Sequence, residues 1–168
     1  MNILLIRGPA NNKAIDLSHY TFSEPLGLQM LYSVLSKENS VEIFDMLADK
    51  TTLEKKLNEK QFDFCGISSA CSDIFMIKDL ARKIKKVKDI PIFIGGYQVK
   101  KTPELFKSKH IDFIMIETNK ENLYKMTESV KRNNSTSKLK GVLRKSLNFE
   151  DCELREVEET FDISRDSV

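Results

Sequence analysis

Two uninterrupted apolar runs, joined by a basic amphipathic segment, constrain the fold of this chain more than any other feature. The first run covers residues 64–67 and the second covers residues 90–94. Neither alternates apolar with polar side chains, which is typical of strands covered on both faces in a parallel sheet. Between the runs, apolar residues recur at helical spacing while lysines point the other way. The stretch therefore predicts a right-handed strand–helix–strand unit.

The remaining apolar runs fit the same arrangement. Residues 3–6 and 41–44 predict the first two strands, and residues 113–116 predict the fifth. Further helices are expected over residues 25–37, around residues 53–57, over residues 103–107 and over residues 119–131. The long aperiodic segment 7–24, which directly follows the first strand, is typical of a functional loop.

The distribution of charge divides the chain into two parts. Residues 1–146 carry 25 basic and 17 acidic side chains, whereas residues 147–168 carry 2 and 8. A polar linker over residues 132–138 precedes a predicted small hairpin, formed by residues 141–144 and 149–154. We therefore expect an α/β domain over residues 1–131, and a linker, hairpin and acidic connector over residues 132–168.

Composition excludes several classes of protein. No apolar stretch approaches the roughly 20 residues that a membrane span needs, so no membrane partner is expected. Cys65, Cys71 and Cys152 form no CxxC pair, which favours reduced thiols in a cytoplasmic protein. The lysines of residues 78–88 follow the outer face of the predicted helix without aromatic side chains to stack bases. No nucleic-acid partner is expected.

Small residues gather after the third and fourth predicted strands. Ser68, Ser69 and Ser72 follow the third strand, and Gly95 and Gly96 follow the fourth. In open α/β sheets, ligands bind beyond the carboxyl ends of the strands, and glycine lets a ligand approach the backbone closely. The serines could equally be satisfied turn hydroxyls, and the glycines could simply turn the chain.

The order of these segments carries a family resemblance. The succession ILLIRGP, SEPLGLQMLYSVL, VEIFD, DFCGISS, IPIFIGGYQ and IDFIMIE resembles the N-terminal cobalamin-binding domain of B12-dependent radical SAM enzymes. Those enzymes include the P-methylase and the anaerobic magnesium-protoporphyrin ester cyclase types. The resemblance implies a flavodoxin-like, Rossmann-like three-layer sandwich with a five-stranded parallel sheet in order 2-1-3-4-5, followed by the small C-terminal hairpin.

The resemblance also implies a site for the dimethylbenzimidazole tail of cobalamin, near the ends of the third and fourth strands. The expected cofactor-binding residues are Pro9, Ser68, Ser69, Ser72, Gly95, Gly96, Tyr97, Glu117 and Thr118. Arg7-Gly8-Pro9 replaces the N-P-P turn of many members, and residues 117–120 (ETNK) replace G-E-G-E. The chain lacks a D-x-H-x-x-G motif, so His19 is not expected to bind cobalt. No catalytic residue or metal ligand is predicted.

The function that the resemblance implies is cobalamin binding within a longer radical SAM enzyme, which would carry out methyl transfer or a radical rearrangement or cyclisation. No CxxxCxxC motif is present, so S-adenosylmethionine and the 4Fe–4S cluster would belong to a separate catalytic domain. This chain alone is not expected to be catalytic. The alternative is a degenerate domain that no longer binds cobalamin and instead binds a substrate, a peptide or another domain. A standalone nucleotide or small-molecule binder comes third.

Overall fold

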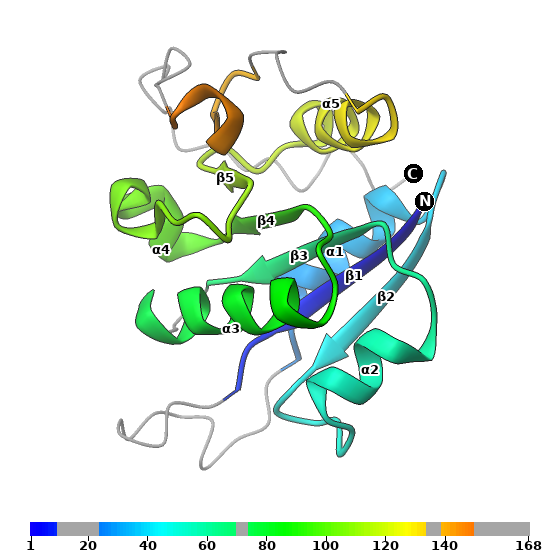
Figure 1. Cartoon of the computed structure of the whole chain (residues 1–168). Helices are drawn as coiled ribbons and strands as arrows, with labels where there is room; N and C mark the ends of the chain where they lie inside the picture. Colours follow the sequence, from blue (N-terminus) through cyan, green and yellow to red (C-terminus); the bar gives the residue numbers. More distant parts are fainter. Residues whose placement is uncertain (10–23, 70–73, 134–138, 150–168) are drawn as a thin grey trace.

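The computed structural model describes residues 1–9, 24–69, 74–133 and 139–149 (Figure 1). Its elements in chain order are β1 (Asn2–Arg7), α1 (Leu26–Leu35), β2 (Ser40–Asp45), α2 (Leu53–Glu59), β3 (Phe64–Ser68), α3 (Ile74–Val87), β4 (Ile92–Gly95), α4 (Tyr97–Lys101), the 3-10 helix η2 (Pro103–Phe106), β5 (Phe113–Met115), α5 (Lys120–Lys131), β6 (Val142–Arg144) and the 3-10 helix η3 (Lys145–Leu147).

The strands form one sheet in the order β2-β1-β3-β4-β5-β6. The first five are parallel, and β6 runs antiparallel to β5. Helices α1 and α5 cover one face, while α2 and α3 cover the other (Figure 1). The predicted three-layer, flavodoxin-like architecture and the order 2-1-3-4-5 are confirmed. The predicted count of five strands is wrong by one.

The additional strand comes from the segment that the sequence assigned to a hairpin. Residues 142–144 pair with β5, with Ile114 opposite Leu143. Val142 packs into the core on the α1 side and Leu143 into the core on the α3 side. A strand buried on both faces belongs inside a layered sheet, which explains why it joins β5. Beyond Phe149, the second arm of the expected hairpin lies outside the described residues.

The sequence analysis did not predict the short helix α4. Helix α4 begins at Tyr97, directly after Gly96, and ends at Lys101. Five residues are too few to show a helical period. The helix expected over residues 103–107 forms as the 3-10 turn η2, which buries Phe106 completely.

An aromatic cluster fills the core between the sheet and helices α1 and α5. The Phe64 ring lies 5.0 Å from Phe93 and 5.9 Å from Phe113, measured between centroids. Gly66 lies among these rings, and a Cβ atom there would be 2.2 Å from the Phe93 ring. The aromatic rings therefore occupy the space that Gly66 leaves open.

The opposite core confirms the amphipathic reading of α3. Ile77, Leu80, Ala81 and Ile84 are buried against the sheet, and Cys65 of β3 is fully buried beside them. No helix in the described part of the chain is long and apolar enough to cross a membrane.

Candidate functional site

The carboxyl ends of the parallel strands place five residues in one row. Arg7 of β1 lies between Asp45 of β2 and Ser68 of β3, and Ser68 is followed by Gly95 of β4 and Met115 of β5. The sequence placed Ser68 and Gly95 at one edge of the sheet. The structure confirms that they are direct neighbours.

Gly95 lacks a side chain although no described residue requires glycine there. Its backbone is not in the left-handed region. A Cβ atom there would lie 3.7 Å from both Met115 Cβ and Thr118 Oγ1, which is ordinary van der Waals contact. Neither backbone strain nor crowding therefore demands glycine at this position. The missing side chain leaves room at the edge where ligands bind in such sheets.

Two half-buried hydroxyls flank Gly95. Ser68 precedes Gly95 in the row, and Thr118 lies across from it, after β5. Neither hydroxyl makes a hydrogen bond with another described residue. Side chains alternate along a strand, so Ser68 shares the α1/α5 face with Phe64 and Gly66. The group of Ser68, Gly95 and Thr118 thus combines a position without a side chain with two hydroxyls that have no hydrogen-bond partner among the described residues.

Ser69 and Gly96 hold the ends of β3 and β4 together. The backbone N–H and the hydroxyl of Ser69 both donate to the carbonyl oxygen of Gly95, at 2.9 and 3.0 Å. Ser69 is fully buried. Gly96 has a φ of 124°, and a Cβ atom there would lie 3.1 Å from Ser69 N and Oγ. These two residues have a structural role that positions Ser68 and Gly95.

Tyr97 and Glu117 lie at the margin of this group. Tyr97 is the first residue of α4, and its exposed ring lies 5.5 Å from Lys101 Nζ. The Glu117 N–H donates to the carbonyl oxygen of Gly141 at 3.0 Å. A Cβ atom at Gly141 would lie 2.6 Å from Glu117 Cβ, so the Glu117 side chain packs over that turn. Thr118, in contrast, faces Gly95.

Of the two remaining predicted residues, Pro9 lies apart from the group and Ser72 is outside the described residues. Pro9 borders a separate cavity of about 260 Å³, lined also by Met46 after β2, Leu53 of α2 and Met76 and Leu80 of α3. This cavity lies on the opposite side of the sheet from the aromatic cluster. His19, Cys71 and Cys152 also lie outside the described residues.

An ion pair that the sequence analysis did not predict lies at the end of the row. Arg7 Nη1 lies 3.3 Å from Asp45 Oδ2, and both side chains are largely buried. The other oxygen of Asp45 accepts a hydrogen bond from the Leu47 N–H at 3.0 Å. The available indication was that oppositely charged residues end the first two apolar strands. Their pairing depended on the strand register.

Within the described ranges, no group of three or more His, Cys, Asp or Glu side chains could hold a metal ion. At the carboxyl ends of the strands, the hydroxyls of Ser68 and Thr118, the Met115 side chain and the backbone surround Gly95. Such a surface can accept a flat organic group, with hydrogen bonds to its polar atoms.

Comparison with known proteins gives the family. The B12-binding domain model matches residues 13–125, which is more than half of the chain. The chain is also 32% identical over 109 residues to an uncharacterized methyltransferase from Pyrococcus horikoshii. That match covers 62% of this chain and 24% of the relative, so it spans about a quarter of the relative's length. No solved structure gives a significant match. On the match over residues 13–125, the chain belongs to the family of B12-binding domains.

Proposed function

We propose that this chain is the cobalamin-binding part of a B12-dependent radical SAM enzyme and that it holds the dimethylbenzimidazole tail beside Gly95. One observation carries the proposal: no described residue requires glycine at position 95, and the two hydroxyls that flank it have no hydrogen-bond partner among the described residues. Gly95 lies at the edge of the sheet where ligands of open α/β folds bind.

The residues present fit the tail of cobalamin. This tail is a flat aromatic base whose polar atoms are its ring nitrogens and the ribose phosphate attached to it, and a glycine admits a flat ring against the backbone. Ser68 and Thr118 can donate hydrogen bonds to its polar atoms, and Met115 supplies an apolar surface. Ser69 and Gly96 keep the two strand ends in position. When bound, cobalamin would supply a cobalt centre that carries a methyl group or takes part in radical chemistry.

The radical SAM assignment rests on the resemblance of the chain's segments to that class of enzyme. The methyltransferase relative is consistent with methyl transfer as the overall reaction, although the match covers only 24% of it. In the proposed enzyme, S-adenosylmethionine and a 4Fe–4S cluster belong to a catalytic domain outside this chain. The role of this chain is to bind and orient the cofactor.

A second candidate function is a domain that no longer binds cobalamin and instead binds another molecule or domain. The aromatic cluster favours it, because the Phe93 ring fills the space beside Gly66, two residues before Ser68 on the same face. Residues 117–120 also carry larger side chains than a G-E-G-E turn would. Binding of a cobalamin tail would therefore have to occur at the level of Ser68 and Gly95.

The test is a titration of the chain with hydroxocobalamin and methylcobalamin, followed by visible absorbance and calorimetry. We expect saturable binding with a stoichiometry near one. Gly95→Val should abolish binding without changing the circular dichroism spectrum, because its methyl groups fill the place of the missing side chain. Ser33→Val, on the exposed face of α1, is the matched control and should bind normally. Absence of binding by the parent chain would contradict the proposal and favour the second candidate.

A further inference from the structure

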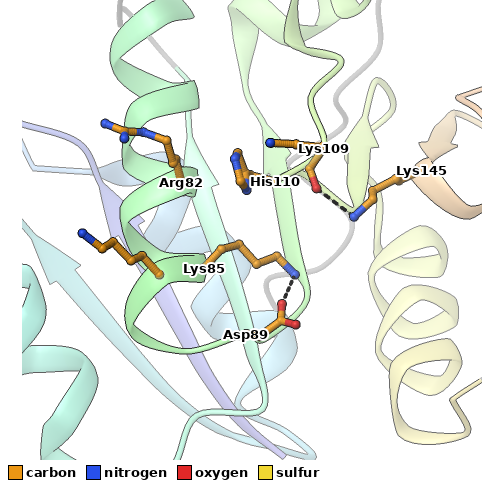
Figure 2. Close-up of a pocket in the computed structure, with 7 residues that line it drawn as sticks. Arg82, Lys85, Asp89, Lys109, His110 and Lys145 are labelled. Atoms are coloured by element: carbon orange, nitrogen blue, oxygen red, sulfur yellow. Dashed lines mark hydrogen bonds and ion pairs between the residues drawn. The ribbon is translucent and has the colours of Figure 1, made fainter.

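A basic cleft lies at the amino-terminal ends of β4 and β5, whereas Gly95 lies at the carboxyl end of β4. It has a volume of about 590 Å³ and is lined by Arg82, Lys85, Lys86, Asp89, Lys109, His110 and Lys145 (Figure 2). The first four belong to the second half of α3 and the turn after it, and Lys109 and His110 precede β5. Because β4 and β5 begin here, the basic cleft is separate from the proposed cobalamin site.

The positive charges of the basic cleft are only partly balanced. Asp79 pairs with Arg82, and Lys85 lies 3.1 Å from Asp89 and 2.8 Å from Asp112. Lys145 shares Asp112 at 3.7 Å. Five cationic side chains therefore meet three carboxylates. Lys86 and Lys109 form no ion pair with any residue in the described part of the chain.

The floor of the basic cleft is already ordered. The Lys85 side chain is only 13% exposed and is held between its two carboxylates. Lys145 Nζ donates to the carbonyl oxygen of Lys109 at 2.7 Å, as Figure 2 shows. This contact ties η3 to the loop that carries His110. Lys85 and Lys145 would therefore lose little further side-chain entropy if an anion bound beside them.

The pKa of His110 reflects the excess of positive charge in the basic cleft. Burial lowers its pKa, and the neighbouring cations Lys109, Lys145, Arg82 and Lys85 lower it further. Both influences favour the neutral imidazole over the protonated one. An anion bound in the basic cleft would oppose this effect and favour the protonated ring.

We propose that the basic cleft binds a small polyphosphate anion, of which inorganic diphosphate is the simplest example. Lysine ammonium groups bind phosphate oxygens as point charges. Lys86 and Lys109 have no carboxylate partner among the described residues. The volume falls within the range of small-ligand sites, about 300–1,000 Å³. Among the described lining residues only His110 is aromatic, so little is present to stack a nucleotide base. We therefore expect the cleft to recognise the phosphate groups themselves.

The experiment titrates the full chain with inorganic diphosphate at low ionic strength, by calorimetry and by NMR of the histidine ring protons. His110→Asn identifies which of the two histidines gives each resonance. We expect saturable binding at one site and an upward shift of the pKa of His110 when diphosphate is present. The double variant Lys86→Gln/Lys109→Gln should lose affinity roughly tenfold, the effect of about 1.4 kcal/mol.

The control is Lys125→Gln/Lys131→Gln, which removes the same charge from α5 on the other face of the sheet. It should leave the affinity unchanged. An equal loss in both double variants would show a general effect of net charge and would overturn the proposal, as would the absence of saturable binding. Binding of ADP without binding of diphosphate would also overturn it, because recognition would then depend on the base.

Discussion

Gly66 of β3, Gly95 of β4 and Gly96 directly after β4 lie close together, yet glycine stands at these positions for different physical reasons. Gly66 is a packing requirement, because the Phe93 ring occupies the place of its side chain. Gly96 is a backbone requirement, with a φ that L residues rarely adopt. Gly95 has neither reason within the described residues. Substitution at these three positions should therefore affect stability and ligand binding in different ways.

Gly66→Ala should destabilise the fold. The added Cβ would overlap the Phe93 ring, and overpacking of this kind typically costs about 1–3 kcal/mol of unfolding free energy. Urea denaturation followed by circular dichroism measures the change. Gly27→Ala in α1 is the matched control, because nothing lies within 4 Å of the new methyl group. It should be neutral or stabilise by up to about 1 kcal/mol, and equal losses in the two variants would contradict the packing argument.

Substitutions of Ser68 and Ser69 should have different effects on stability and on cobalamin binding. Ser69→Ala removes the hydroxyl that donates to Gly95, so the unfolding free energy should fall by about 1 kcal/mol. Ser68→Ala removes a hydroxyl with no partner among the described residues, so stability should stay within about 0.5 kcal/mol of the parent chain.

The same pair tests the proposed contact with cobalamin. Ser68→Ala should weaken cobalamin binding about fivefold, the effect of one neutral hydrogen bond. Chemical denaturation and cobalamin titration, carried out on both variants, check the two expectations. A Ser68→Ala variant with lower stability and unchanged affinity would reverse the assigned roles.

At the scale of elements, a small charge network ties α2 to β2. Glu42 of β2 accepts from Lys60 and lies 2.9 Å from Lys56, which also pairs with Glu59. The hydrogen bond from Lys60 holds the pKa of Glu42 below its ordinary value, with Lys56 adding to the effect against the opposing influence of burial. The network joins α2 and the residue after it to the edge strand.

Stability should follow the ionisation of Glu42. Its pKa is lower in the folded chain, so its contribution is present above the unfolded value of about 4.3 and is lost as the pH falls through the folded value. Because the side chains are partly exposed, Glu42→Gln should cost only about 0.5 kcal/mol at pH 7. The difference from the parent chain should vanish in strong acid.

Denaturation curves at several pH values measure this effect. Glu38→Gln is the control, since Glu38 is exposed and forms no ion pair with a described residue. A difference between Glu42→Gln and the parent chain that persists at the lowest pH would show that packing, not charge, links α2 to β2.

The elements that the sequence predicted well are those with a long local pattern. Helix α3 was predicted because its apolar stripe repeats over four turns, and the five parallel strands because each is a short, mainly apolar run. Helix α4 is too short to leave such a pattern. The pairing of β6 with β5 joins residues about 30 positions apart, and an apolar run does not identify its partner strand.

On the scale of the whole molecule, the candidate site was partly predictable. The rule that parallel strands end at one edge placed Ser68 and Gly95 together before the structure was known. Side-chain direction decided the rest. The register brought Arg7 beside Asp45, the Ser69 hydroxyl turned to Gly95, and Pro9 came to border a cavity on the other face. The opposite charges of Arg7 and Asp45 were the one indication in the sequence, and even that pair depends on the strand register.

The buried thiol of Cys65 should report unfolding of the whole domain. It lies fully buried in β3, and burial raises its pKa, so little thiolate forms in the native chain. With Cys71 and Cys152 replaced by serine, Cys65 should react with a thiol reagent only as fast as the domain unfolds. Reaction rates in increasing urea, compared with unfolding rates, make the measurement. The control is Ser33→Cys with the natural cysteines replaced, which should react at once in the native state.

The antiparallel direction of β6 determines where a following domain would be tethered. The strand starts beside Glu117 at the ligand edge and ends beside Asp112, so the chain leaves the sheet at the basic cleft. In the proposed enzyme, this exit and the cofactor site would be separated by the height of the sheet, about 20 Å for a six-residue strand. An extended tether gains about 3.3 Å per residue, so roughly six residues are the minimum reach. The length of such a connector would therefore be more strongly constrained than the identity of its residues.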